Sequence, residues 1–268
     1  MLKYLNSLFV LILISVLFNS CSKVPLTGRS QLDLIPDNEM LSMSFQQYDQ
    51  FLKDNKESTN QKEIALIKKI GERVAKAVDQ YFVQNNLSQQ LQGYKWEFHL
   101  IDSKEVNAWC MPGGKVVVYT GILPVTKTEA GLAVVLGHEI AHAVAKHGNE
   151  RMSQAMVAQL GGVALSQALK EKPALTQNIF MAAFGIGTQV GVLLPFSRLQ
   201  ESEADHLGLI FMAMARYDPN EALDFWQRMA SMQNGQAPPE FLSDHPSDQT
   251  RVEKIRSEIP EAMKYYKE

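Results

Sequence analysis

Two histidines and a glutamate stand at metal-site spacing in residues 138–142, which read His138-Glu139-Ile140-Ala141-His142. Residues four apart on a helix lie about 40° apart on one face, so both imidazoles can bind a single Zn²⁺. Glu139 then stands where it can accept a proton from the water that attacks a substrate. The motif predicts a zinc hydrolase site with His138 and His142 as metal ligands and Glu139 as the catalytic base.

The sequence around this motif has a helical pattern. Apolar side chains recur at helical spacing along the segment, at Leu132, Val135, Leu136, Ile140 and Val144. Upstream, residues 126–129 read Thr-Lys-Thr-Glu, which is typical of a capping box at the start of a helix. We therefore expect the motif to lie on a helix, as the chemistry requires.

A catalytic zinc usually has three protein ligands and one open position, so a third ligand must come from elsewhere in the chain. A metzincin would have Gly at 145 and a histidine ligand at 148, whereas this chain has Ala145 and Gly148. His147 is about 180° from His138 around a continuous helix. We interpret His147 as a solvated residue near the helix end.

A carboxylate-rich segment, residues 197–205, predicts the start of a second helix. Glu201 and Asp205 are one turn apart on the same face, while Glu203 points away. If Glu201 binds the metal, Asp205 can accept a hydrogen bond from a ligand imidazole and fix its tautomer. The alternative is an ordinary acidic helix face without a metal.

Further motifs occur in the same order along the chain as in a known family. Residues 25–29 read PLTGR, residues 107–114 read NAWCMPGG, and residues 245–247 read HPS, followed by Arg251. With the two motifs above, the chain resembles the zinc metallopeptidases related to the CAAX prenyl endoproteases and the HtpX-like heat-shock proteases, in particular their periplasmic lipoprotein subgroup. The resemblance implies an α+β, mainly α-helical, gluzincin-type domain with an active-site helix and a small, edge-exposed sheet.

The resemblance also implies roles for particular residues. It implies Glu201 as the third zinc ligand and places His245 and Arg251 beside the metal, with Arg251 pairing with the carboxylate ligand. Asp205 and Arg251 would then support the ligands without binding the metal. His245 could stabilise the tetrahedral oxyanion, or it could occupy the open zinc position and silence the enzyme; the sequence leaves both open.

Periodicity predicts the elements around the site: helices over residues 37–55 and 62–83, and strands over 94–100 and 115–120. The resemblance implies that strand 115–120 lines the cleft and presents its edge to an extended peptide, with Asn107 and Ala108 binding substrate. An internal sheet strand is the alternative.

The N-terminal 20 residues resemble a bacterial lipoprotein signal. Lys3 precedes an apolar stretch that is too short for an ordinary membrane span, and the stretch ends just before Cys21. We expect acylation of Cys21 as a membrane anchor, a tether over residues 21–38 and a catalytic domain over 39–268. A simple secretory peptide is the alternative. The expected location is the bacterial cell envelope, as a periplasm-facing lipoprotein of the outer membrane.

The composition of the chain limits the classes of molecule that we expect it to bind. The net charge is −3 with both signs interspersed, so we expect no binding of nucleic acid. Residues 152–196 are rich in Ala, Gly, Met and Gln, and we interpret them as buried or lid-like helices in preference to a transmembrane span. Extended or unfolded polypeptides are the expected substrates.

These observations predict a zinc-dependent endopeptidase with one Zn²⁺ per chain, and the resemblance implies that it hydrolyses misfolded or misassembled envelope proteins. One alternative is a periplasmic chaperone or assembly factor for outer-membrane proteins whose zinc site is largely silenced. The presence of Glu139 argues against purely structural zinc, because a structural site needs no base. The other alternative, a membrane-integral protease, would require membrane spans.

Overall fold

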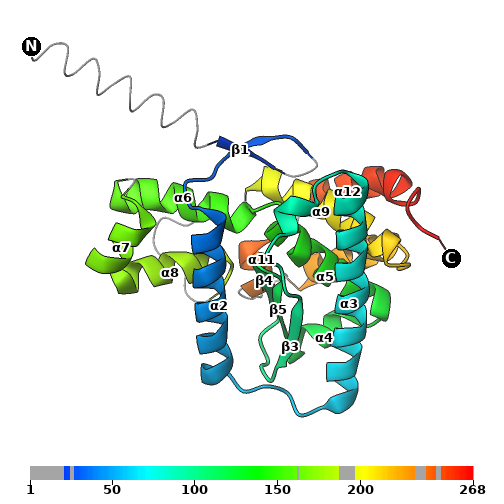
Figure 1. The fold of residues 1–268 in the computed structure, drawn as a ribbon. Helices are drawn as coiled ribbons and strands as arrows, with labels where there is room; N and C mark the ends of the chain where they lie inside the picture. Colours follow the sequence, from blue (N-terminus) through cyan, green and yellow to red (C-terminus); the bar gives the residue numbers. More distant parts are fainter. Residues whose placement is uncertain are drawn as a thin grey trace, which may run out of the picture.

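The computed structural model of the 268-residue chain describes residues 21–24, 27–161, 163–186, 197–232, 240–245 and 249–267. Within these ranges the fold is α+β and mainly helical, as expected, with helices packed around a three-stranded sheet (Figure 1). The longer helices are α2 (Asp37–Asp54), α3 (Gln61–Gln84), α5 (Glu129–Val144), α6 (His147–Leu160), α8 (Pro173–Ala183), α9 (Arg198–Met214), α10 (Glu221–Ser231) and α12 (Gln249–Ala262). The shorter ones are α4 (Leu123–Thr126), α7 (Leu165–Glu171) and α11 (Glu240–Asp244), with 3-10 turns η1 (Ser88–Leu91) and η2 (Thr120–Ile122).

The main sheet has the strand order β3-β5-β4, with β3 (Glu97–Ile101) parallel and β4 (Ala108–Met111) antiparallel to β5 (Lys115–Tyr119). β5 is therefore the central strand, and the expectation that it presents an edge is wrong. Gly113 and Gly114 have φ of +83° and +81°, which glycine adopts without strain, so the chain folds back tightly and β4 pairs with one side of β5. Because β3 pairs with the other side, β3 and β4 are the two edge strands.

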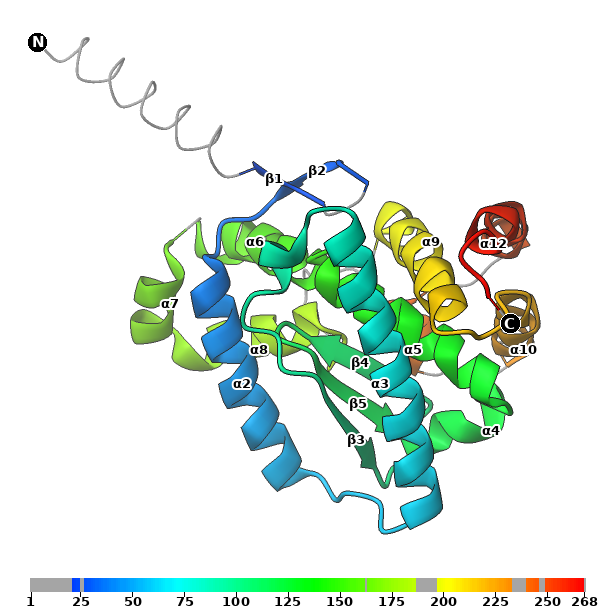
Figure 2. The ribbon, with the colours of Figure 1, turned by 45° about the vertical axis from the view of Figure 1, so that its right-hand side comes forward.

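Helix α5 is the centre of the larger core, and its residues 131–144 are all buried. Helices α3, α9 and α10 pack against it, and α12 lies beyond α9 (Figure 2). At the α5–α9 crossing the backbones touch through Gly137 and Gly208. A Cβ added to Gly208 would lie 3.0 Å from both the carbonyl carbon of Gly137 and the amide nitrogen of His138.

The start of α5 differs from the expected capping box. Its N-cap is Thr128, whose Oγ1 accepts a hydrogen bond from Gly131 N at 2.9 Å. Thr126 ends the preceding short helix α4 instead, and its hydroxyl donates to Leu123 O at 3.0 Å. The helix itself is confirmed, but it begins two residues later because the first threonine belongs to another element.

A second apolar cluster joins α2, α6, α7 and α8 to the other face of the sheet through Trp109, Val117 and Tyr119. The interpretation of residues 152–196 as helices holds for the described part, and residues 187–196 lie outside it. None of the helices in the described ranges is long and apolar enough to cross a membrane.

The segment expected to be a tether contains a small hairpin. Strands β1 (Cys21–Lys23) and β2 (Ser30–Leu32) pair antiparallel, and residues 1–20, with the expected signal peptide, lie outside the described residues. Val24 is buried in the main core, so the hairpin packs onto the domain.

Candidate active site

Four side chains converge at one buried point. His138 and His142 come from α5, Glu201 from the first turn of α9, and His245 follows α11. One donor atom from each lies within 4.8 Å of all the others. His138 Nε2 is 3.0 Å from His142 Nε2 and 3.2 Å from His245 Nδ1, while Glu201 Oε1 is 2.9 Å from His245 Nδ1 and 3.3 Å from His142 Nε2.

The orientation of the two α5 imidazoles fits a metal ion. His138 Nδ1 faces Asp205 Oδ1 at 3.0 Å, and His142 Nδ1 faces His147 Nδ1 at 2.9 Å. With each Nδ1 turned to a partner, the two Nε2 atoms direct their lone pairs at each other, which a shared cation stabilises. A histidine pair completed by a carboxylate is a donor set that Zn²⁺ prefers.

Glu201 is held as an anion. Burial alone would raise its pKa, but His245 and Arg251 outweigh burial and hold the pKa of Glu201 well below its usual range. Arg251 Nη1 lies 2.6 Å from Glu201 Oε2, which leaves Oε1 directed at the imidazoles. Glu201 is therefore available as a charged ligand.

Arg251 also binds Asp205, one turn further along α9. Its Nε and Nη2 each donate to Asp205 at 2.8 Å, and its guanidinium lies 3.5 Å from the ring centroid of Trp226. Although burial raises the pKa of Asp205, the charge of Arg251 and the bond to His138 bring it below the usual value. Asp205 can thus accept a hydrogen bond from His138 and orient that ring.

Glu139 lies beside the donors without joining them. Its carboxylate is buried, and Oε1 has no hydrogen-bond partner within the described residues, with His245 Nε2 nearest at 3.5 Å. Burial raises the pKa of Glu139, while the neighbouring His245 and His138 oppose that rise. A buried carboxylate with a free oxygen next to a metal-type donor cluster suits a general base.

His147 is placed differently from the expectation. It is fully buried, because Lys146 adopts a left-handed conformation (φ +60°) and ends α5, so the chain turns before α6 begins. The interpretation as a solvated residue assumed one continuous helix and is wrong. His147 Nε2 instead lies 3.2 Å from Glu203 Oε2, so His147 connects His142 to a second α9 carboxylate.

Asn107 and Ala108 lie at the start of the edge strand β4, and both are buried. Asn107 O accepts a hydrogen bond from Tyr119 N at 3.1 Å, and Asn107 Oδ1 accepts one from Ala108 N at 2.8 Å. Their assignment to substrate binding stays a prediction. The expected edge is present in the sheet, on β4 and not on β5.

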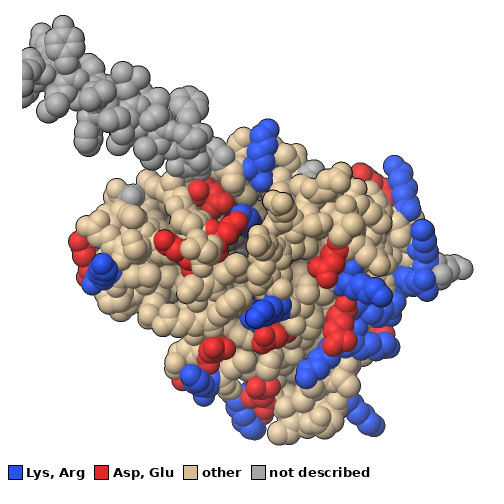
Figure 3. Space-filling view, viewed as in Figure 1, with Lys and Arg blue, Asp and Glu red and all other residues tan. Residues whose placement is uncertain are grey.

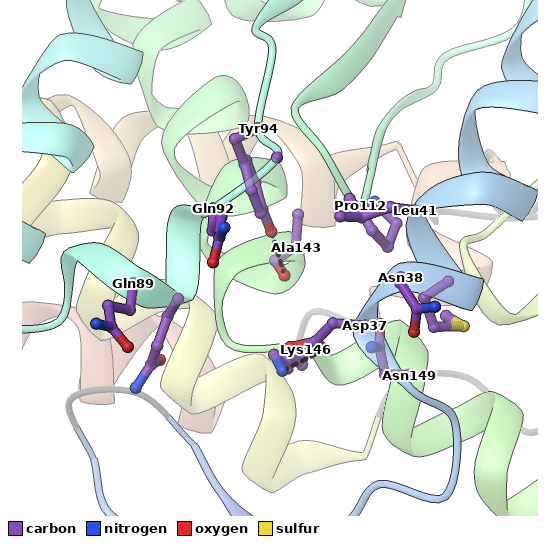
Figure 4. A pocket seen from close by; sticks show the side chains of 13 residues that line it. Asp37, Asn38, Leu41, Gln89, Gln92, Tyr94, Pro112, Ala143, Lys146 and Asn149 are labelled. Atoms are coloured by element: carbon purple, nitrogen blue, oxygen red, sulfur yellow. Dashed lines mark hydrogen bonds and ion pairs between the residues drawn. The ribbon is translucent and has the colours of Figure 1, made fainter.

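A separate cavity of about 380 Å³ lies near the C-terminal end of α5, lined from α2, the η1 region and α6. Figure 4 shows the Tyr94 hydroxyl directed toward Ala143, whose carbonyl accepts its hydrogen bond at 3.2 Å, with Lys146 close to Asp37. None of the four donors lines this cavity. It is therefore distinct from the metal-type site.

A helix-borne histidine pair completed by a carboxylate from a second helix defines a zinc-peptidase type of domain. Residues 65–259 match the model of Peptidase family M48, and the chain belongs to that family. The broader recognition of a zinc metallopeptidase is confirmed, whereas the lipoprotein subgroup is not.

Curated relatives include mitochondrial metalloendopeptidase OMA1 of Schizosaccharomyces pombe, 43% identical over 63% of this chain and 48% of its own length. Metalloendopeptidase OMA1 of Bos taurus is 32% identical over 96% of this chain and 50% of its own length. The β-barrel assembly-enhancing protease of Escherichia coli is 28% identical over 60% of this chain and 34% of its own length. The chain spans about half the length of the curated OMA1 relatives from these organisms.

The expected location is overturned by these comparisons. The prediction was a periplasm-facing lipoprotein of a bacterial outer membrane, whereas the relatives with the higher identities are mitochondrial endopeptidases from yeasts, a plant and vertebrates. A short apolar leader ending before a cysteine is a weak signal, because it depends on composition and not on the geometry of the folded domain.

Proposed function

We propose that this chain is a zinc-dependent endopeptidase. The observation that carries the proposal is the buried Oε1 of Glu139, which accepts no hydrogen bond from the described residues, beside the cluster of His138, His142, Glu201 and His245. A purely structural site would need no such base. Membership of Peptidase family M48 and the endopeptidase names of the relatives support the same activity.

His138, His142 and Glu201 would hold the zinc ion, which supplies Lewis-acid activation of water and of the scissile carbonyl. Glu139 accepts the proton of the attacking water and delivers it to the leaving amine, a contribution of about 10²–10⁴-fold. Asp205 holds the His138 tautomer, and Arg251 keeps Glu201 and Asp205 ionised. The raised pKa of Glu139 suits a group that must both accept and release a proton.

The proposed substrates are extended or unfolded segments of polypeptide. Backbone pairing along β4, the edge strand that packs on α5, would present a carbonyl to the site independently of the side chains. We place the activity in protein quality control at a membrane, acting on misfolded or misassembled proteins. The name of the β-barrel assembly-enhancing relatives favours this role.

A second candidate is an assembly factor whose zinc site is largely silenced. The position of His245 favours it, since Nδ1 lies among the donor atoms at 3.2 Å from His138 Nε2. An imidazole there would act as a fourth ligand and close the position that a catalytic zinc keeps open.

Zinc analysis combined with digestion of casein tests the two candidates. The endopeptidase should contain about one zinc per chain and cleave casein, and a chelator should remove both properties. The Glu139→Gln variant is the matched control, because it retains the ligands and lacks the base. Bound zinc with no cleavage under any condition would reject the endopeptidase and support the assembly factor.

Membrane attachment through an acyl group on Cys21 remains a separate proposal. Its support is the short apolar leader that ends before this cysteine. Mass spectrometry of the mature N-terminus tests it. An unmodified Cys21, or cleavage elsewhere, would reject the anchor without affecting the peptidase proposal.

A further inference from the structure

A salt-bridge cluster behind the donor site connects the N-terminal hairpin to the metal ligands. Arg29, which immediately precedes β2, lies between two buried carboxylates on different helices. Its Nε donates to Glu203 Oε2 at 2.8 Å, and its two terminal nitrogens donate to the two oxygens of Glu150 at 2.9 and 2.8 Å. Such a forked contact to two carboxylates is specific to arginine.

The loop that carries Arg29 is itself fixed. Val24 N donates to Arg29 O at 2.7 Å, and Gly28 N donates to Val24 O at 3.0 Å, with Gly28 in a left-handed conformation (φ +70°). Thr27 Oγ1 adds a hydrogen bond to Glu203 Oε1 at 2.7 Å. Thr27 and Arg29 therefore present two donors to the same carboxylate.

From Glu203 the contacts continue to a metal ligand. His147 Nε2 lies 3.2 Å from Glu203 Oε2, and His147 Nδ1 lies 2.9 Å from His142 Nδ1. The only proton arrangement that uses both contacts of a neutral His147 has His142 Nδ1–H donating to His147 and His147 Nε2–H donating to Glu203. That arrangement leaves His142 Nε2 as a bare donor atom for a metal.

Each of the two α5 imidazoles is thus oriented by a carboxylate that an arginine holds in place. His138 is oriented by Asp205, and Arg251 holds that carboxylate from α12. His142 is oriented through His147 by Glu203, and Arg29 holds that carboxylate from the hairpin. The difference is that the support for His142 depends on a segment far from the peptidase helices in sequence.

We propose that Arg29 is a positioning residue for the metal ligand His142, acting through Glu203 and His147, so that docking of the N-terminal hairpin sets the zinc affinity of the site. The inference rests on the proposed zinc site but not on peptide hydrolysis. Partners of ligand imidazoles commonly change metal affinity by about 10–100-fold when they are removed. The Arg29→Gln variant should weaken zinc binding within that range.

The test measures the zinc dissociation constant by competition with a chelator on the full chain, in a Glu139→Gln background that prevents self-digestion. Arg29→Gln is compared with Arg73→Gln, a half-buried arginine whose bonds go to Tyr217 and to the Ala215 carbonyl, away from the site. The expected result is a loss of affinity for Arg29→Gln alone. Equal affinities in both variants, or equal losses in both, would overturn the proposal.

A double-mutant cycle separates positioning from general weakening of the hairpin. If Arg29 acts through Glu203, the Arg29→Gln change should have little further effect on zinc affinity in a Glu203→Gln background. Arg29→Lys should fall between the parent and Arg29→Gln, because one ammonium cannot fork between two carboxylates. Additive losses in the cycle would show that Arg29 acts by another route and would overturn the proposal.

The outcome is distinguishable from failure of the proposed function. A parent chain that binds zinc, loses affinity on Arg29→Gln and never cleaves peptide would reject the endopeptidase while supporting the positioning role. A parent chain that cleaves casein, but whose zinc affinity is unchanged by Arg29→Gln, would support the endopeptidase and reject the positioning role of Arg29.

Discussion

The guanidinium carbon of Arg251 lies over the ring of Trp226, 3.5 Å from its centroid, while the guanidinium nitrogens bind the carboxylates of Glu201 and Asp205. Stacking and forked hydrogen bonding use different faces of the same group, so neither contact weakens the other. One side chain from α12 thereby fixes two residues of α9 against α5. Arg251 is therefore the first residue to substitute in a test of stability.

Replacing Arg251 by glutamine should destabilise the protein by about 3–5 kcal/mol, because two buried carboxylates lose their counter-charge. Denaturant unfolding measures the loss. Arg256→Gln, an exposed position on the same helix, is the control and should change stability by less than about 0.5 kcal/mol. Equal stabilities for the two variants would show that Arg251 is not needed to offset the buried charges.

Glu139→Gln should abolish casein hydrolysis and leave about one zinc per chain, since the base is removed and the ligands remain. Metal analysis and turnover are measured on the same sample. His142→Ala is the comparison and should lose both metal and activity. Retained hydrolysis in Glu139→Gln would reject the assignment of the base.

His245→Ala should raise basal hydrolysis of casein, because the imidazole lies 2.9 Å from Glu201 and among the donor atoms, where it competes for the open metal position. Turnover and zinc content of this variant show whether His245 blocks the open metal position. A fall in kcat of about 10²–10³-fold with zinc retained would instead assign His245 to stabilisation of the transition state. Unchanged turnover and unchanged zinc would exclude both roles.

Glu258 gives a pH-dependent prediction that is independent of the metal. Burial, opposed by Lys254, raises its pKa to about 7, above the value of about 4.3 expected in the unfolded chain. The neutral carboxyl favours folding, so its stabilising effect is complete below about pH 4 and is lost as the pH rises toward 7. At pH 8 the ionised Glu258 should cost about 1–2 kcal/mol, after allowance for its partial exposure.

Glu258→Gln should therefore melt a few degrees above the parent at pH 8, and the difference should shrink as the pH falls toward 4. Thermal unfolding at both pH values measures this. Glu253→Gln, at an exposed position on the same helix, should show no such trend. A stabilisation of equal size at both pH values would contradict the assignment to ionisation.

Gly208→Ala should separate α9 from α5, because the new methyl group would meet the backbone of Gly137 and His138 at 3.0 Å. Since the proposed zinc ligands lie on both helices, we expect weaker zinc binding as well as lower stability. Chelator competition and thermal unfolding test the two effects. Leu199→Ala, at an exposed position near the start of α9, serves as the control. Unchanged zinc affinity in Gly208→Ala would show that the site tolerates a wider helix spacing.

Much of the fold could be predicted from the sequence where the pattern is local. The helices over 37–55 and 62–83 and the strand over 115–120 agree with α2, α3 and β5 to within one or two residues. Periodicity gives the type of an element but not its neighbours. It could not place β5 at the centre of the sheet, because that order depends on β3 and β4 pairing with opposite sides of β5, and pairing partners leave no periodic signal.

In the candidate site, too, the sequence pattern predicted the arrangement of residues that are close in sequence and missed contacts between distant ones. Helical spacing brought His138, His142 and Glu139 together, and the four-residue repeat placed Glu201 and Asp205 on one face. His147 was missed because one left-handed residue, Lys146, ends the helix and redirects the chain. The sequence at residue 146 does not signal that change, since a lysine rarely adopts a left-handed conformation. The contact from Arg29 to Glu203 spans 174 residues and has no local signature.

The wide separation of the donors along the chain links metal binding to folding. His138 and His245 are 107 residues apart, yet their ring nitrogens lie 3.2 Å from each other. A chain that has closed only the α5–α9 contact offers three donors, and the fourth arrives only when α11 docks. Zinc uptake should therefore follow the closing of the α5–α9 contact, which completes the three proposed ligands, and chains that have not closed it should hold the metal loosely and exchange it quickly.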